Sequence, residues 1–347
     1  MVSLCGSKMK QAAIRKFSST RSSTLTPIEP NGMKRSVPGP TSPWHFISLL
    51  LYSVLRRPMS IDTGVKAGIY LCISAGGSLI FDFVRVPPTY FSNKYNVLNQ
   101  LFIKWGWGWT CVSLATFLVF STFVYTGGNI RLMRAHMLRI VVGTGCWYTI
   151  TGLINFVHDT TGHCHHPSAD ILNSGVRPNR RTPCHRAGGS WLGFDISGHC
   201  FLLVLCNLWI IEEVRSMQYW NRLADILKPY DQYTDGSSTS SSDALLLSRR
   251  VPPDEAKVMR SSFRRLTGSV RLIFSLVACL SMLWDFSFLV TIVYFHTMPT
   301  KLIGTVLAVA CWFVFYRVIF RAAKTGDWFG LAPGMPGDSP LDFTPRR

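Results

Sequence analysis

The sequence contains few charged residues, and acidic residues are especially scarce. Only 16% of its 347 residues are Asp, Glu, Lys or Arg, with 18 acidic residues against 36 basic ones. Soluble domains usually carry about 25% charged residues, so the deficit argues against a soluble protein. Apolar residues make up 48% of the chain, and its mean hydropathy is +0.21. This composition predicts an integral membrane protein.

Two further absences narrow the class of protein. The net charge of +18 would suit a nucleic-acid-binding protein, but the sequence has no DNA or RNA recognition motif. Its basic residues flank apolar runs instead, which is typical of contact with anionic lipid headgroups. Residues 1–42 are rich in Ser, Thr, Pro and basic residues and lack the apolar run of a signal peptide. We therefore predict a disordered, basic, cytosolic tail over 1–42.

Six segments have the roughly 20 apolar residues that a transmembrane helix needs. They are residues 65–84, 101–124, 137–157, 190–211, 272–295 and 301–320. The stretch "WHFISLLLYSVLRR" is shorter, which favours an interfacial amphipathic helix over 43–60 rather than a span. We predict an all-α membrane domain of six spans over 61–325, interrupted by a flexible, Ser-rich insertion at 225–262. A C-terminal tail follows at 326–347.

The distribution of basic residues predicts the topology. With the N-terminus in the cytosol, 28 of the 36 Lys and Arg residues fall on the cytosolic side and eight on the other. This bias follows the positive-inside rule and predicts that both termini are cytosolic. The same topology brings His199, at the start of the fourth span, and His296, at the end of the fifth, to one membrane face.

The stretch "GFDISGHC" at 193–200 contains a candidate acid–base site. On a helix, Asp195 and His199 would share one face, where a carboxylate can orient an imidazole and stabilise its protonated form. Ser197 and Gly198 offer a hydroxyl and a close backbone approach to an anionic oxygen. The alternative is a polar helix cap made by Asp195 or Ser197. A cap does not require a histidine, so we favour the acid–base site.

The non-cytosolic loop "HDTTGHCHHP" at 158–167 allows two interpretations. Its histidines and cysteine could form a closed zinc site, or the loop could simply be polar and solvated. We favour the loop without a metal. Cys164 and Cys184 lie in this same loop, and in an oxidising lumen a disulfide between them is predicted.

A second stretch on that face is "YFSNKYNVLNQLFIKWGWGWT" at 90–110. Its three tryptophans suit a belt at the level of the lipid headgroups. The polar residues before them, Lys94 in particular, are candidates for binding a phosphate.

The chain resembles the fat storage-inducing transmembrane (FIT) family. The resemblance rests on the 90–110 stretch and on "GCWYTI", "GGSWLGFDISGHCFLLVLCNLWIIEE" and "VYFHTMPTKLIGTVLAVACW". It implies an endoplasmic reticulum membrane protein that supports lipid-droplet formation and phospholipid balance, with its active site facing the lumen. The family is similar to lipid phosphate phosphatases, whose sites contain an S-G-H motif and a second, distant histidine. A lipid phosphatase-like helical bundle is therefore expected.

The resemblance also implies a reaction, namely hydrolysis of the phosphoanhydride of fatty acyl-CoA to acyl 4′-phosphopantetheine and 3′,5′-ADP. His296 would attack phosphorus and His199 would protonate the leaving oxygen, without a metal or a cofactor. Ser197 and backbone N–H groups near Gly198 would hold the phosphate oxygens. The phosphatases' K-x6-R-P element is absent, so another cation must meet the phosphate, and Lys94 is our preferred candidate.

Two other functions are compatible with parts of this sequence. A non-enzymatic protein that binds or partitions diacylglycerol and triacylglycerol would also suit aromatic-rich spans. It would have no need for both His199 and His296, which favours the enzyme. A transporter is disfavoured because Asp285 is nearly alone as a charge within the predicted spans. The sequence identifies no protein partner.

Overall fold

The computed structural model describes residues 42–84, 86–165, 180–218, 220–221, 223, 253–320 and 329. The predicted tail at 1–42 lies outside them except for Ser42, and the tail at 326–347 except for Phe329. Residues 225–252 of the predicted insertion are also outside the described part of the chain.

Five helices of the described chain are long and apolar enough to cross a membrane: Thr63–Phe83, Gly106–Tyr125, Ile130–Thr161, Asp254–Tyr294 and Met298–Ile319. The first joins α2 (Thr63–Cys72), a π-helical turn (Ile73–Gly77) and α3 (Ser78–Phe83). The others are α4 (Gly106–Tyr125), α5 (Ile130–Thr161), α12 (Pro253–Tyr294), and α13 (Met298–Trp312) with its π-helical extension Phe313–Ile319. The predicted all-α membrane fold is confirmed, whereas the count of six spans stays a prediction.

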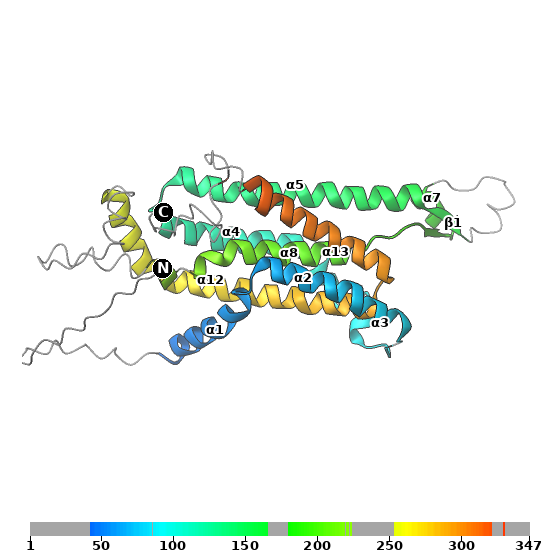
Figure 1. The fold of residues 1–347 in the computed structure, drawn as a ribbon, viewed down its shortest axis with the longest axis horizontal. Coiled ribbons are helices and arrows are strands. Elements are labelled where there is room, and N and C mark those ends of the chain that lie inside the picture. The colour runs from blue at the N-terminus through cyan, green and yellow to red at the C-terminus, as the bar shows by residue number, and fades with distance from the viewer. Residues whose placement is uncertain are drawn as a thin grey trace, which may run out of the picture. The chain divides into compact units, whose positions relative to one another are not determined.

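The helix α8 (Gly198–Val214) lies at the centre of the bundle and contacts α2, α4, α5, α12 and α13 (Figure 1). Every residue from Leu203 to Val214 is buried. A helix enclosed on all sides must be apolar all round, which explains the unbroken apolar run in the sequence. At 17 residues α8 is shorter than the five candidate spans, and a 3₁₀ turn, Arg215–Gln218, continues it.

Two predicted boundaries differ from the structure. The span predicted at 190–211 begins too early, because Ser190–Leu192 forms β2, which pairs antiparallel with β1 (His163–His165). The helix α12 begins at Pro253, so the last residues of the predicted insertion 225–262 are helical. Proline at the first helical position and acidic residues in the first turn both favour a helix start there.

The remaining elements are short or peripheral. The helix α1 (Pro43–Met59) contacts α12, with the rings of Tyr52 and Phe274 5.5 Å apart, and exposes Phe46, Leu50 and Val54 elsewhere. Its exposed apolar residues suit the predicted interfacial helix, which stays a prediction. A 3₁₀ turn (Tyr90–Ser92) and a π-helical segment (Leu98–Ile103) connect α3 to α4, and α7 (Arg181–Arg186) precedes β2.

Candidate active site

Elements from distant parts of the sequence meet at one end of the bundle. The turn between α12 and α13 lies at the same end as α3, β1 and α7 (Figure 1). The polar side chains gathered there are His158 at the end of α5, Asp195 before α8, His199 in its first turn, and His296 between α12 and α13. We call these four residues the histidine cluster.

Asp195 connects two histidines of the cluster. One carboxylate oxygen, Oδ2, lies 3.4 Å from Nδ1 of His296, and the other, Oδ1, lies 3.8 Å from Nδ1 of His158. The sequence predicted that Asp195 and His199 share one helical face. This prediction is wrong, because Asp195 lies before the helix begins. The helix begins only at Gly198, so Asp195 lies in the irregular segment before it and can reach other elements.

His199 has a different partner, Asn99. The Nε2 atom of His199 lies 3.0 Å from Oδ1 of Asn99, and the Asn99 Nδ2 group donates to the backbone oxygen of Lys94 at 2.6 Å. With its amide nitrogen facing that carbonyl, Asn99 presents an acceptor to His199. His199 must then donate from Nε2, so its neutral form leaves Nδ1 as the unprotonated nitrogen.

The surroundings of His296 favour its neutral form. Burial lowers the pKa of His296 below its usual value; the carboxylate of Asp195 opposes this effect, and the ammonium group of Lys301 adds to it. Because Nδ1 faces Asp195, Nε2 is the nitrogen left to act as a nucleophile. The ring of Phe295, the residue before His296, lies parallel to that of His199 with 6.5 Å between centroids, which brings the start of α8 next to the turn that carries His296.

The start of α8 is held closely against α13. Ser197 is the N-cap of α8 and is fully buried; its Oγ accepts from the backbone N–H of Cys200 at 3.3 Å. The hydroxyl thus serves as the cap that the sequence allowed as an alternative. A Cβ atom at Gly304 would lie 2.5 Å from the Ser197 carbonyl oxygen, so glycine permits this contact. Gly198 has no atom within 4 Å of its ideal Cβ position, which leaves space at the helix N-terminus.

The neighbouring loop is tied to the end of α5. Cys164 and Cys184 are joined by a disulfide that closes a separation of 20 residues. The indole nitrogen of Trp191 in β2 donates to the His158 backbone oxygen at 3.2 Å. Among the described residues, no group of three or more His, Cys, Asp or Glu has the geometry to hold a metal ion. Residues 166–179 of this loop, including His166, lie outside the described chain.

The predicted phosphate ligand, Lys94, is an exposed residue whose ammonium group lies 5.5 Å from the centroid of the Tyr95 ring. Its backbone oxygen, rather than its charge, reaches the cluster by way of Asn99. The sequence analysis missed Asn99, and it considered His158 only within the 158–167 loop, as part of a zinc alternative that it did not favour. The one available signal was that Asn99 lies in the 90–110 stretch on the same predicted membrane face.

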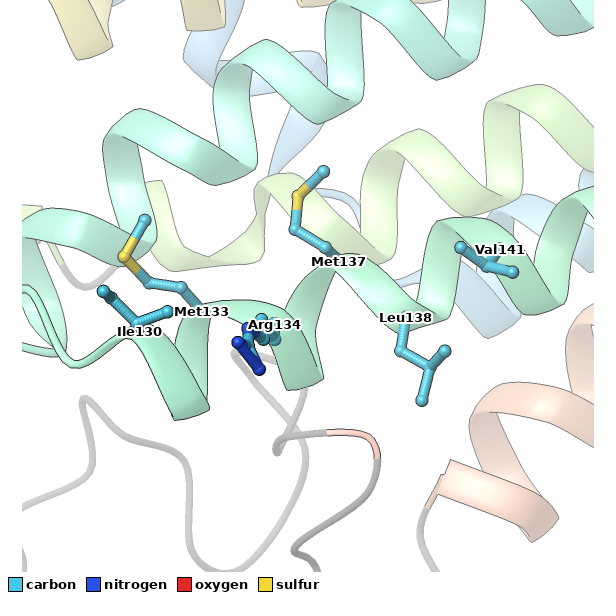
Figure 2. Close-up of a pocket in the computed structure, with 6 residues that line it drawn as sticks. All are labelled: Ile130, Met133, Arg134, Met137, Leu138 and Val141. Atoms are coloured by element: carbon cyan, nitrogen blue, oxygen red, sulfur yellow. The ribbon is translucent and has the colours of Figure 1, made fainter.

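A shallow apolar hollow of about 370 Å³ lies away from the cluster, on the outer face of α5 near its start (Figure 2). It is lined by Ile130, Met133, Arg134, Met137, Leu138 and Val141. His158 lies at the other end of this helix, so the hollow is not part of the candidate site. Because α5 is a candidate span, lipid chains are the expected neighbours of this face.

Comparison with known proteins points to one group. The family described as "Fat storage-inducing transmembrane protein" matches residues 87–316. The chain is 31% identical to acyl-coenzyme A diphosphatase FITM2 of Drosophila melanogaster over 89% of the chain and 69% of that protein. The proteins of the same name from Xenopus laevis and Homo sapiens are 32% and 30% identical, over 78% and 76% of this chain and 84% and 82% of theirs. No solved structure matches the chain.

Proposed function

We propose that this chain, which belongs to the fat storage-inducing transmembrane protein family, hydrolyses fatty acyl-CoA at its phosphoanhydride. Its relatives at about 30% identity carry the name acyl-coenzyme A diphosphatase. The observation that supports the proposal is the histidine cluster: among the described residues, Nδ1 of His199 and Nε2 of His296 have no hydrogen-bond partner. The products would be acyl 4′-phosphopantetheine and 3′,5′-ADP.

The first step is attack by Nε2 of His296 on phosphorus. A bond forms between this nitrogen and phosphorus while the anhydride P–O bond breaks. Protonated His199 donates the proton on Nδ1 to the leaving phosphate oxygen, and its Nε2–H remains bonded to Asn99. Asp195 stabilises the positive charge that develops on His296.

The second step returns the enzyme to its starting state. Neutral His199 takes a proton from water at Nδ1, and the resulting hydroxide attacks the phosphohistidine. The P–N bond breaks, and the electron pair returns to Nε2 of His296. One water is consumed for each anhydride cleaved.

Nearby groups must compensate the negative charge of the phosphates, since phosphoryl transfer depends mostly on positioning and charge stabilisation. The N-terminus of α8, with open space at Gly198, suits an anionic oxygen because of the helix dipole. His158 adds a third imidazole, whose Nδ1 lies 3.8 Å from Oδ1 of Asp195 and has no closer polar partner among the described residues. Its ring lies beside Asp195 within the cluster, whereas Lys94 is exposed and its ammonium group lies over the Tyr95 ring, so His158 is better placed than Lys94 to contact the phosphate.

We place the site in the lumen of the endoplasmic reticulum, with both termini in the cytosol and α8 as a sixth span. The basic-residue bias supports this topology. The disulfide beside the cluster suits an oxidising compartment. In this orientation the acyl chain stays in the bilayer while the phosphoanhydride reaches the histidines.

The test is turnover of oleoyl-CoA by the protein purified in detergent, with mass spectrometry for 3′,5′-ADP. The native protein should release it, whereas His199→Ala and His296→Ala should not. His163→Ala, an exposed histidine in β1, is the matched control and should be as active as the native protein. Unchanged turnover in both variants would refute the mechanism. Binding of diacylglycerol or triacylglycerol without turnover by the native protein would favour the non-enzymatic alternative.

A further inference from the structure

The turn that carries His296 has an unusual backbone. His296 has a φ of 60°, and among the described residues it is the one non-glycine residue with a positive φ. A side chain with a Cβ atom is strained in this left-handed region, and such strain persists only where the surrounding structure imposes it. The contacts on either side of His296 therefore indicate what holds this residue in place.

On the C-terminal side, the start of α13 is capped from another helix. Thr297 is the N-cap residue, but its side chain makes no capping hydrogen bond. Oδ2 of Asp82, near the end of α3, instead accepts from the backbone N–H of Met298 at 2.7 Å. A carboxylate at a helix N-terminus also interacts favourably with the helix dipole. Asp82 thus fixes the position at which the chain leaves the turn.

On the N-terminal side, Lys301 reaches back across the turn. Its Nζ donates to the backbone oxygen of Ile292, in the last turn of α12, at 3.0 Å. The same ammonium group lies 3.4 Å from Oδ1 of Asp82, and the Lys301 side chain is only 2% exposed. One buried cation therefore joins the end of α12, the start of α13 and the end of α3.

We propose that Asp82 and Lys301 are positioning residues that hold His296 in its left-handed conformation. Their role is to keep Nδ1 of His296 on Asp195 and Nε2 directed at the substrate. The Lys301 ammonium already contacts Asp82 and Ile292, so it acts through the turn and not as a phosphate ligand. This inference rests on the proposed function, in which His296 is the nucleophile.

The kinetic test compares Lys301→Met and Asp82→Asn with two matched controls, Lys104→Met and Asp254→Asn, whose side chains are exposed. A displaced nucleophile should lower kcat for oleoyl-CoA by about 10- to 100-fold, while KM stays within about twofold. Both controls should keep the native kcat. A raised KM with unchanged kcat would overturn the proposal, because it would indicate loss of substrate binding.

A conservative variant separates positioning from folding. Lys301→Arg keeps a cation that can reach the same two oxygens, so it should recover most of the kcat lost in Lys301→Met. If Lys301→Arg is folded, elutes as the native protein does and still has the low kcat of Lys301→Met, positioning of His296 by Lys301 is not the reason for the loss.

A second measurement does not depend on activity. Diethyl pyrocarbonate modifies unprotonated imidazoles, and mass spectrometry of the peptides gives the rate for each histidine. Lys301→Met or Asp82→Asn should raise the rate at His296 several-fold while the rate at His163 stays unchanged. Unchanged labelling of His296 in both variants would refute the positioning role of Asp82 and Lys301, even in an active enzyme. Raised labelling in a protein without turnover would instead count against the proposed function alone.

Discussion

The two ends of α8 contain polar clusters with opposite properties. At its last turn, Arg139 donates to both carboxylate oxygens of Glu213 at 2.7 and 2.6 Å, and neither side chain is exposed. Tyr316 donates to the same carboxylate at 2.5 Å, and the neighbouring Glu212 accepts from Trp312 at 3.0 Å. At the first turn, the contacts of Asp195 with histidines are 3.4 and 3.8 Å long, and its side chain is 60% exposed.

This difference separates a structural cluster from a reactive one. Short, buried contacts hold helices together, and removing one partner leaves an unpaired charge in the interior. Long and partly open contacts leave carboxylate and imidazole groups able to engage a substrate. The glutamate end of α8 should therefore respond to mutation through stability, and the histidine end through turnover.

The largest expected effect is at the glutamate end. Arg139→Ala leaves the Glu213 carboxylate buried without its cation, which should cost about 3–5 kcal/mol of unfolding free energy. Thermal unfolding in detergent measures this loss, with Arg134→Ala, on the exposed side of the same helix, as the control. Turnover per folded molecule should not change. A stable Arg139→Ala protein without turnover would contradict the assignment of this end of α8 to stability.

A double variant tests whether the unpaired charge causes this loss of stability. Arg139→Met combined with Glu213→Gln removes both charges and keeps an acceptor for the Tyr316 hydroxyl. Because no unpaired charge remains, most of the lost stability should return. A double variant as unstable as Arg139→Ala would show that packing, and not charge, dominates this end.

The disulfide should contribute nearly as much to the stability of the other end. Replacing both Cys164 and Cys184 by serine opens the loop that their sequence separation of 20 closes. In the chain-entropy model this should lower the free energy of unfolding by about 3 kcal/mol. The melting temperature of the double variant should be lower than that of the native protein and should not respond to reductant. Cys72→Ser, at an exposed free cysteine, is the control. A melting temperature equal to the native one would contradict this prediction.

Asn99 should matter to turnover and little to stability. In Asn99→Leu, the Nε2–H of His199 loses its acceptor and the ring loses its fixed tautomer, so kcat should fall by about 100-fold. Gln100→Leu is a close control, because Gln100 also donates to the Lys94 oxygen, at 3.2 Å, whereas the partner of His199 is Asn99. Equal loss of kcat in the two variants would mean that the loop, and not the tautomer, is responsible.

The smallest expected effect is a shift in pH dependence. Asp195 raises the pKa of His296, so Asp195→Asn should lower that pKa further. Since the nucleophile must be neutral, activity is lost as pH falls through this pKa, and the acidic limb of kcat/KM should move to lower pH. The pH profile of oleoyl-CoA turnover measures the shift, and movement to higher pH would contradict the assignment.

Sequence reasoning succeeded where a local pattern was sufficient. Long apolar segments predicted five of the helices, because burial in lipid demands length and apolar composition. It also predicted that His199 and His296 lie at one membrane face, which stays a prediction; in the structure Asp195 contacts His296, and the ring of His199 lies parallel to that of Phe295. It paired Asp195 with the wrong histidine because a spacing of four residues implies contact only within a helix, and Ser197 caps the helix after Asp195.

By itself, the sequence determined an all-α membrane protein and its family, and it predicted the two histidines of the candidate site. Those features depend on composition, apolar length and local motifs, which a linear chain displays directly. Only the tertiary structure decided that Asp195 faces His158 and His296, that Asn99 orients His199, and that Asp82 and Lys301 hold the strained turn. These partners are far apart in the chain, and their contacts exist only once the helices have packed.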